Sequence, residues 1–336
     1  MTIKDLAAKT GYAVGTVSRA LNNHPNVSEK ARETILRAAD ESGFQLNMNA
    51  KQLKQQNSNT IAVVVKGIGN ELFAEMLEII QHLVAQTRYQ LSVDYMDEDQ
   101  NEVLEALRLC REKKPRGILF LGGNQTAFAA DFGKIDVPCV LVTNDASGFG
   151  FENLSSVSTN GPDAAKGAIE TLIEMGHRRI AIIGGDLKSS DTSRLRYEGC
   201  LQAFREHGIA FDEKKDYQGT RFSFQDGYRA TQKLLDEGRE FTAIFAVADV
   251  MAIGAIRALW ERGLKVPEDV SVMGFDGLPM CSYLVPQLTT VRQPVRTMAV
   301  RSVEILLRSM ESGTPAVHEV IPVEIYRRES VRAIKE

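Results

Sequence analysis

From Thr60 onward, the chain alternates short apolar runs with longer stretches whose apolar residues recur at the helical period. The runs lie at 60–65, 91–96, 117–123, 139–144, 179–185, 243–249 and 270–276, and the helical stretches lie near 70–87, 101–113, 162–175, 192–207, 225–237 and 250–262. Runs that are apolar on both faces and alternate with helices are typical of parallel sheets in an α/β fold. One sheet core does not hold about 275 residues, so we expect two similar lobes.

Residues 2–22 follow a different pattern, that of two short helices separated by a turn at 10–12. Leu6 and Ala7 of the first helix are expected to face Val17 and Leu21 of the second. The outward residues of the second helix are small or hydrogen-bonding, namely Val14, Gly15, Thr16, Ser18, Arg19 and Asn22. A slim helix with such donors fits the major groove of DNA. The alternative is an ordinary helical hairpin with a polar outer face.

A third helix is predicted after Ser28, which can act as its N-cap. An apolar stripe on this helix can cover the first two helices and consists of Ala31, Ile35, Ala38 and Ala39. Residues 46–59 are polar and rich in Gln and Asn, and only 50–54 could form one or two helical turns. The pattern therefore predicts a helical DNA-binding domain at 1–45, a hinge helix or linker at 46–59, and a larger domain at 60–336.

The distribution of charge supports this division. Residues 1–58 hold eight lysines and arginines against five acids, and the rest of the chain holds 32 against 39. The first segment is therefore net positive and the remainder net negative. A positive segment at the helical end is what binding to a polyanion requires.

Polar residues follow the predicted strands of the larger domain. Lys66, Tyr95, Asn144, Asp145, Asp186, Asp249 and Asp276 stand at strand ends, and Arg194 and Arg196 open the helix after the run at 179–185. Ligands of parallel α/β sheets bind beyond the carboxyl ends of the strands. Carboxylates, amides and guanidinium groups, with Phe222 as an aromatic platform, suit a sugar or another polyol. Each residue alone could equally be a loop or capping group.

The sequence offers little support for an enzyme or a metal site. It has no G-x-S-x-G elbow, no Walker loop and no G-x-G-x-x-G after a strand. The five histidines and four cysteines are scattered without metal-ligand spacing, so we expect neither a metal nor a cofactor. No apolar run approaches the roughly eighteen residues of a membrane span, and no secretory signal pattern is present. We therefore expect a soluble cytoplasmic protein.

Several ordered motifs resemble one known family. The segment from Thr2 to Phe44 is similar to the DNA-binding headpiece of lactose/galactose repressor-type regulators, and the matches to their sensor domain lie at 176–185, 194–204, 249–259, 266–277 and 288–294. The resemblance implies a two-lobed core like that of periplasmic sugar-binding proteins, with three crossovers between the lobes. It places lobe 1 at about 60–160 and 292–321, and lobe 2 at about 161–291 and 322–336. It also implies a homodimer.

The resemblance assigns roles to individual residues. It implies base contacts by Val14, Gly15 and Arg19, phosphate contacts by Thr16, Ser18, Asn22 and Asn26, and a minor-groove hinge at Ala50 and Leu53. For the effector site it implies Phe73, Asn144, Asp145, Arg196, Phe222, Asp249 and Asp276. Three features depart from the family pattern: Ala13 replaces the usual Ser or Thr N-cap, Gly15 replaces a bulkier residue, and the hinge lacks the usual Arg/Pro-containing segment.

These observations predict a transcriptional regulator, most simply a repressor, that binds a pseudo-palindromic DNA operator. A small ligand, most simply a carbohydrate, would bind between the lobes and control operator affinity. A different interpretation is a solute-binding protein of a transport system, although such a protein should have a signal peptide and no basic helical unit. The same residues are also compatible with a regulator that responds to a purine, or with an enzyme that uses the cleft carboxylates for acid–base chemistry.

Overall fold

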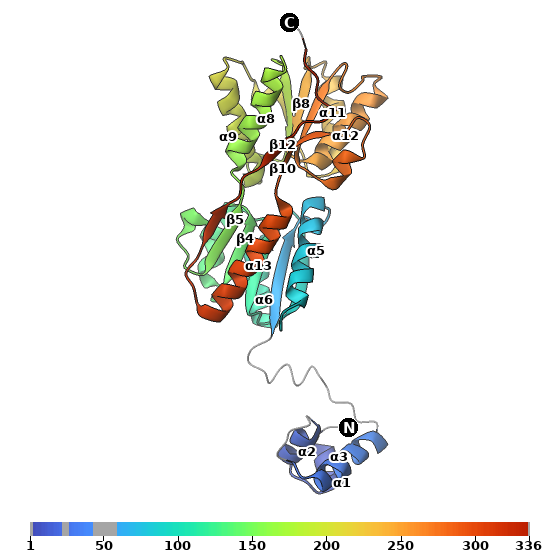
Figure 1. Ribbon diagram of the computed structural model, residues 1–336, viewed down its shortest axis with the longest axis vertical. Coiled ribbons are helices and arrows are strands. Elements are labelled where there is room, and N and C mark those ends of the chain that lie inside the picture. The colour runs from blue at the N-terminus through green and yellow to red at the C-terminus, as the bar shows by residue number, and fades with distance from the viewer. Residues whose placement is uncertain (1–2, 22–26, 43–58, 335–336) are drawn as a thin grey trace. The chain divides into compact units, whose positions relative to one another are not determined.

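The computed structural model describes residues 3–21, 27–42 and 59–334. They belong to two compact units that divide between Ser58 and Asn59. Figure 1 colours the first unit dark blue and the second from light blue to red. Within the described residues, no helix is long and apolar enough to cross a membrane, and no group of acidic, histidine or cysteine side chains could hold a metal ion.

The described residues of the first unit form three helices, α1 (Ile3–Thr10), α2 (Val14–Leu21) and α3 (Glu29–Glu41). Gly11 turns the chain between α1 and α2 with a φ of +71°, a conformation that glycine adopts without steric cost. The helices enclose a small apolar core formed by Leu6, Ala7, Val17, Ala20, Ile35 and Ala39. Ala20 is thus buried where Leu21 was expected, and Leu21 packs at the edge. Ser28 occupies the N-cap position of α3, but its side chain makes no capping hydrogen bond.

The second unit contains two six-stranded sheets. The first sheet has the order β11-β5-β4-β3-β1-β2 and consists of β1 (Thr60–Lys66), β2 (Gln90–Met96), β3 (Gly117–Leu121), β4 (Cys139–Thr143), β5 (Leu154–Ser158) and β11 (His318–Val320). The second has the order β12-β10-β9-β8-β6-β7 and consists of β6 (Ile180–Gly184), β7 (Tyr217–Gly219), β8 (Ala243–Ala246), β9 (Ser271–Asp276), β10 (Thr289–Arg292) and β12 (Glu324–Tyr326). All neighbouring strands are parallel except β10 and β12.

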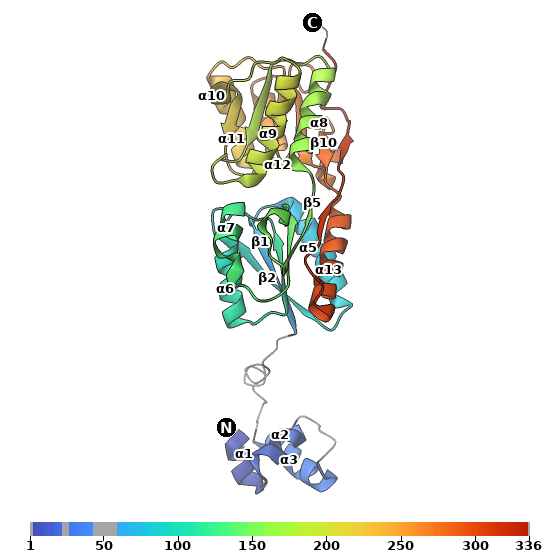
Figure 2. The same ribbon diagram turned by 90° about the vertical axis from the view of Figure 1, so that its left-hand side faces the viewer.

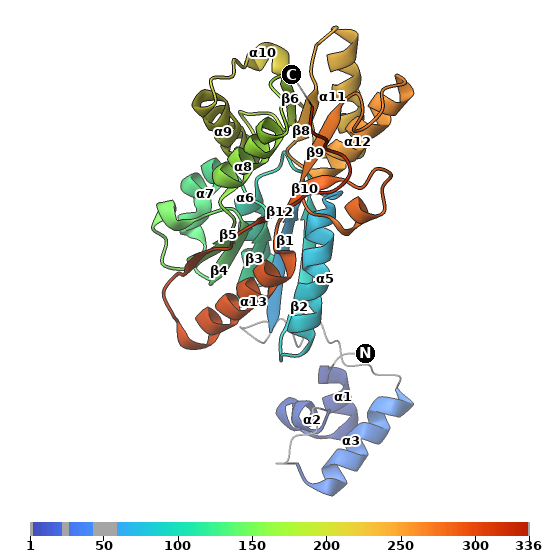
Figure 3. The ribbon, with the colours of Figure 1, turned by 45° about the horizontal axis from the view of Figure 1, so that its top comes forward.

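Helices cover both faces of each sheet. In lobe 1, the part built on the first sheet, α5 (Glu71–Ala85) and α13 (Val295–Ser312) lie together on one face, and α6 (Glu102–Glu112) and α7 (Gln125–Asp131) lie on the other (Figures 2 and 3). In lobe 2, built on the second sheet, α8 (Gly161–Glu174) packs on α9 (Asp191–Glu206), and α11 (Phe224–Asp236) packs on α12 (Asp249–Glu261). The one-turn helix α10 (Glu213–Asp216) precedes β7.

The chain passes between the lobes three times, from β5 to α8, from β10 to α13 and from β11 to β12. The predicted strand and helix stretches correspond to elements of the fold. The apolar pattern did not predict the longer elements β5 and α13, nor the shorter ones α7, α10, β7, β10, β11 and β12. β5 is buried on both faces although three of its five residues are serines. Ser155 Oγ accepts from the Val317 N–H at 3.0 Å, and Ser156 Oγ accepts from the Ala146 N–H at 3.1 Å. These bonds satisfy the hydroxyl groups of Ser155 and Ser156, whereas the buried Ser158 hydroxyl has no hydrogen-bond partner among the described residues.

Candidate effector cleft and DNA-reading helix

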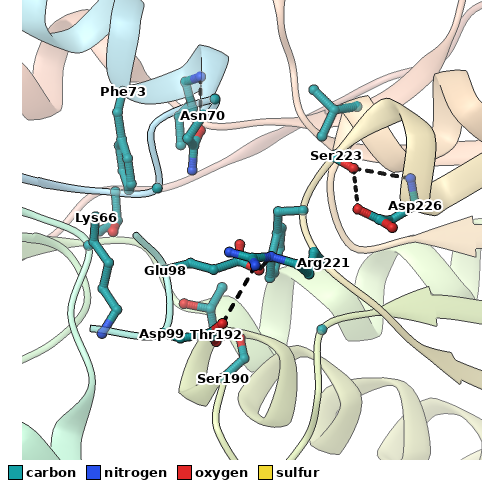
Figure 4. Close-up of a pocket in the computed structure, with 18 of the residues that line it drawn as sticks. Lys66, Asn70, Phe73, Glu98, Asp99, Ser190, Thr192, Arg221, Ser223 and Asp226 are labelled. Atoms are coloured by element: carbon teal, nitrogen blue, oxygen red, sulfur yellow. Dashed lines mark hydrogen bonds and ion pairs between the residues drawn. The ribbon is translucent and has the colours of Figure 1, made fainter. Parts of the chain in front are cut away.

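A cavity of about 730 Å³ lies between the two lobes (Figure 4). Lobe 1 contributes the end of β1 with the loop that follows it, the turn after β2, the loop after β3 and the end of β4. Lobe 2 contributes the loops after β6 and β7 and the end of β9. These are carboxyl ends of parallel strands, where α/β folds bind ligands. The volume is in the range of sites for small molecules.

Three candidate ligand residues are positioned by capped helix starts. Phe73 lies in the first turn of α5, where the side chain of Asn70 accepts a hydrogen bond from the Leu72 N–H. Arg196 lies in α9, whose N-cap is Ser190. Phe222 directly precedes Ser223, the N-cap of α11 (Figure 4). N-caps of this kind contribute about 1 kcal/mol each to helix stability and fix where each helix begins.

The two phenylalanines face the cavity because glycines make room for their rings. A Cβ on Gly122 would lie 3.1 Å from the Phe73 ring, and a Cβ on Gly185 would lie 2.8 Å from the Phe222 ring. Both aromatic rings line the cavity, one from each lobe. Aromatic faces on opposite lobes can therefore contact the same bound molecule.

Arg196 is a buried cation in the cavity wall. Its guanidinium carbon lies 3.6 Å from the centroid of the Phe275 ring, and Nη1 donates to the Val247 carbonyl. Nη2 lies 3.8 Å from Asp276 Oδ1. Among the described residues, Arg196 Nε has no hydrogen-bond partner although it is buried. Because burial lowers the pKa of Arg196 while its hydrogen bonding stays incomplete, the guanidinium can gain from a ligand that supplies an acceptor.

Asp276 forms the other half of this pair at the end of β9. Gln293 Nε2 donates to Asp276 Oδ1 at 2.8 Å, and Gln293 begins the crossover to lobe 1. Asp276 has a φ of 120°, a conformation that residues other than glycine rarely adopt. Burial raises the pKa of Asp276 to about 7, against the lowering effect of Arg196. A carboxyl group held in this way can exchange hydrogen bonds with hydroxyl groups of a ligand.

Polar contacts join the lobes at the rim of the cavity. Arg221 of lobe 2 pairs with the turn after β2, with 2.6 Å from Nη2 to Asp97 Oδ1 and 2.6 Å from Nε to Glu98 Oε1 (Figure 4). Asn124 Nδ2 of lobe 1 also donates to the Ser189 carbonyl of lobe 2 at 2.9 Å. We call the Arg221 contacts with 97–99 the rim clasp. These contacts join the two lobes across the cavity.

The cavity lining includes four of the seven effector residues that the family resemblance implied, Phe73, Arg196, Phe222 and Asp276. Asp249 is not in the lining. Its carboxylate is fully buried and accepts from the Leu278 N–H at 2.7 Å and the Thr290 hydroxyl at 2.6 Å, which ties α12 to β10 and the loop after β9.

Asn144 and Asp145 also lie outside the cavity lining. Asn144 is buried and accepts from the Thr143 hydroxyl at 3.1 Å. Asp145 accepts from the Ser147 N–H and the Ser156 hydroxyl, so its carboxylate orders the loop between β4 and β5. Tyr95, another strand-end residue, is exposed outside the lining, whereas Lys66 and Asp186 do line the cavity.

Sequence reasoning missed the rim clasp. Arg221 is the neighbour of Phe222, the predicted aromatic platform, and was not itself predicted to have a role. The acidic residues after β2 are typical of a strand that is followed by the charged first turn of a helix, so they did not indicate a contact with the other lobe. The one available signal was charge complementarity between two segments more than a hundred residues apart. Such a signal has no value until the fold brings the segments together.

In the helical unit, α2 presents the predicted DNA-reading surface. Val14, Gly15 and Arg19 are exposed, while Val17 and Ala20 point into the core. Arg19 Nε donates to the Gly15 carbonyl at 3.1 Å, so the side chain lies along the helix. Thr16 and Ser18 are half-buried beside this surface. Asn22, Asn26, Ala50 and Leu53, as well as Gly43 and Phe44, lie outside the described residues.

The start of α2 lacks a side-chain cap. The Ala13 carbonyl accepts from the N–H groups of Thr16 and Val17, as an N-cap residue does, but the Ala13 methyl group cannot accept a hydrogen bond. A Cβ on Gly15 would meet nothing within 4 Å. The exposed first turn of α2 is therefore less stabilised than a helix with a polar cap.

A three-helix unit with an exposed second helix, followed by two α/β lobes around a polar cavity, defines the class of transcriptional regulators with a periplasmic-binding-protein-like domain. Residues 2–47 match the family of bacterial regulatory proteins called the lacI family, and residues 169–331 match the periplasmic binding protein-like domain. The chain belongs to the lacI family and is a DNA-binding transcriptional regulator. These matches confirm the predicted family and fold class.

Individual relatives agree with this assignment. The HTH-type transcriptional regulator MalR of Clostridium butyricum is 35% identical over 333 residues, covering 98% of this chain and 99% of its own. Catabolite control protein A of Priestia megaterium is 30% identical over 94% of each chain.

Solved structures show the same similarity. The lac repressor dimer bound to operator and the anti-inducer ONPF matches with a TM-score of 0.73 and 27% identity over 99% of both chains. A complex of the regulator CelR with cellobiose matches with a TM-score of 0.70 and 27% identity, covering 98% of this chain and 99% of that one.

Proposed function

We propose that this protein is a cytoplasmic, homodimeric repressor whose operator affinity is controlled by a carbohydrate bound in the cavity between the lobes, and that it has no enzymatic role. One observation carries the proposal: the buried Arg196–Asp276 pair and the rings of Phe73 and Phe222 line a single cavity. A guanidinium and a carboxyl group bind sugar hydroxyls, and aromatic faces pack against the apolar faces of sugar rings. The cellobiose complex of CelR supports this choice of ligand class.

The DNA end of the proposal rests on α2. Arg19 can donate two hydrogen bonds to guanine, a contact that contributes about 1–3 kcal/mol of base discrimination. Val14 and Gly15 would lie against neighbouring base edges, and Thr16 and Ser18 would contact phosphates that position the helix. In a dimer, two such helices would bind half-sites about one helical turn apart.

The relative orientation of the two lobes would couple ligand binding in the cavity to DNA binding by α2. A ligand that contacts Phe73 in lobe 1 and Arg196 in lobe 2 binds one relative orientation of the lobes better than others, so it shifts their equilibrium. An allosteric coupling of about 1–3 kcal/mol would change operator affinity by roughly 5–150-fold.

The test measures binding of the full-length protein to DNA from upstream of its own gene, by fluorescence anisotropy, with and without a panel of mono- and disaccharides. We expect Arg19→Ala to lose specific binding, while Arg37→Ala, on the exposed face of α3, retains most of it. Arg196→Gln should bind DNA but lose the response to the sugar that acts on the wild type. Specific binding by Arg19→Ala equal to that of the wild type would contradict the docking of α2. An unaltered sugar response in Arg196→Gln would contradict the proposed site.

A further inference from the structure

We propose that the cavity selects an effector that carries no phosphate or carboxylate group, namely a neutral or amine-bearing sugar. This inference rests on the proposed function, because it takes the cavity between the lobes as the effector site. Its basis is the charge state of the lining: among the described residues, each cation that lines the cavity is already paired with a carboxylate of the protein. An anionic ligand would therefore have to break one of these pairs to be neutralised.

The described lining contains three cations, Lys66, Arg196 and Arg221. Lys66 Nζ lies 2.5 Å from Glu102 Oε2. Arg196 lies opposite Asp276, and Arg221 is engaged by the acidic turn at 97–99 in the rim clasp. A phosphate or carboxylate group is bound most strongly by a guanidinium or ammonium group whose charge is not already balanced by a carboxylate of the protein. The Arg196 Nε–H, which has no partner among the described residues, can still donate to a neutral oxygen without breaking the pair with Asp276.

The Lys66 pair is the least replaceable of the three. Glu102 is fully buried at the start of α6, and it also accepts from the Asn124 N–H. The Lys66 ammonium makes a further hydrogen bond of 3.0 Å to the Gln100 carbonyl. If Lys66 turned to a ligand phosphate, the Glu102 carboxylate would stay buried without its cation, which is strongly unfavourable.

Carboxylates outnumber cations in the lining. Besides the acids already paired, the lining includes Glu71, and Asp186 in the loop after β6. Asp186 Oδ1 accepts from the backbone N–H groups of Lys188 and Ser189. Within the described chain, neither Glu71 nor Asp186 forms an ion pair with a lysine or arginine side chain. The cavity is therefore net negative, which opposes the entry of an anion and favours neutral or cationic ligands.

The test compares ligands that share one scaffold and differ in charge. Thermal-shift and calorimetric measurements on the full-length protein would use glucose, glucosamine, glucose 6-phosphate and glucuronate, and also adenosine and adenosine 5′-monophosphate. We expect each anionic member to bind at least 100-fold more weakly than its neutral parent, and an amine-bearing member to bind at least as well. An anionic member that binds as tightly as its parent would overturn the inference.

Inorganic phosphate provides a test that does not depend on the right sugar. We expect phosphate to give the wild-type protein no more thermal stabilisation than chloride at equal ionic strength. The triple variant Asp97→Asn/Glu98→Gln/Asp99→Asn releases Arg221 and should gain at least tenfold in affinity for glucose 6-phosphate or phosphate. Asp131→Asn, which releases the exposed Lys134 on lobe 1, is the matched control and should gain nothing.

The outcomes separate this inference from the proposed function. If no sugar binds but adenosine binds better than its monophosphate, the carbohydrate part of the proposed function fails and the charge selection stands. If phosphate stabilises the wild type and Arg221→Gln abolishes that stabilisation, the charge selection fails even where a sugar acts as effector.

Discussion

Asp276 is predicted to make the stability of the protein depend on pH in a way that Asp276→Asn removes. The carboxyl group is buried beside Arg196, and Asp249 adds a like charge nearby. Burial raises the pKa of Asp276 from 3.8 to about 7. The ionised Asp276 carboxylate therefore lowers the stability of the folded protein. We attribute the presence of an aspartate at this position to ligand binding.

The size and the sign of this pH dependence follow from the difference between the pKa of Asp276 in the folded and the unfolded chain. In the unfolded chain the carboxyl group loses its proton near its ordinary pKa, and in the folded chain it loses the proton only near pH 7. Between these pKa values the folded state binds more protons, so stability falls as pH rises. A shift of about three pKa units corresponds to about 4 kcal/mol, since one unit is about 1.4 kcal/mol. This loss is absent below the unfolded pKa and complete above the folded one.

The assay is chemical denaturation of the full-length wild type and of Asp276→Asn, followed by circular dichroism at several values between about pH 4 and pH 8. We expect the free energy of unfolding of the wild type, minus that of the variant, to fall by up to about 4 kcal/mol across this range. Burial also raises the pKa of Asp249, to about 6. Because Asp249 and Asp276 interact, Asp276→Asn also changes the titration of Asp249, and the measured difference includes this change.

Asp186→Asn is the matched control from the same cavity. Hydrogen bonds from the backbone of Ser189 and Lys188 lower the pKa of Asp186, so its contribution to stability is present above its ordinary pKa and lost as pH falls. The control difference should therefore have the opposite slope. A stability difference between the wild type and Asp276→Asn that stays constant, or that grows with pH, would refute the reasoning.

Three further predictions concern other parts of the molecule. Leu6→Ala removes a fully buried side chain from the three-helix unit and should cost about 2–5 kcal/mol, so DNA binding is lost while ligand binding by the lobes is retained. Gly15→Ala should stabilise the three-helix unit by about 0.5–1 kcal/mol and so raise its melting temperature, because a Cβ at this position meets nothing within 4 Å. Arg221→Gln should increase the radius of gyration of the ligand-free protein in small-angle scattering, because the rim clasp is lost.

Two of these predictions, Leu6→Ala and Arg221→Gln, have a matched control. Leu36→Ala, at an exposed position of α3, should leave both stability and DNA binding nearly unchanged. For the rim clasp the control is Arg229→Gln, whose arginine is exposed on α11 and faces only Asp226 at 3.7 Å. Equal scattering by Arg221→Gln and the wild type, or a destabilised Gly15→Ala, would contradict the corresponding argument.

The order of most elements could be predicted from the sequence because burial leaves a local record. Strands such as β1 and β6 are buried on both faces and carry continuous apolar runs, and the helices between them repeat at the helical period. The pattern did not predict β5, in which the buried Ser155 and Ser156 form hydrogen bonds with Val317 and His318 far along the chain. It also did not predict the pairing of β11 with β5, because a three-residue edge strand has no periodicity of its own.

By itself, the sequence determined the class of fold, the family and the chemistry available at the strand ends. Only the tertiary structure decided which of those groups face the cavity. Asp249 and Asp276 both follow an apolar run and have the same local signal, yet one carboxylate bonds inward to Thr290 while the other lines the cavity with Arg196. The rim clasp likewise depends on the tertiary structure, which brings Arg221 next to residues 97–99. The physical reason is that a side chain's role here depends on segments brought together by three crossovers, and local periodicity contains no information about such partners.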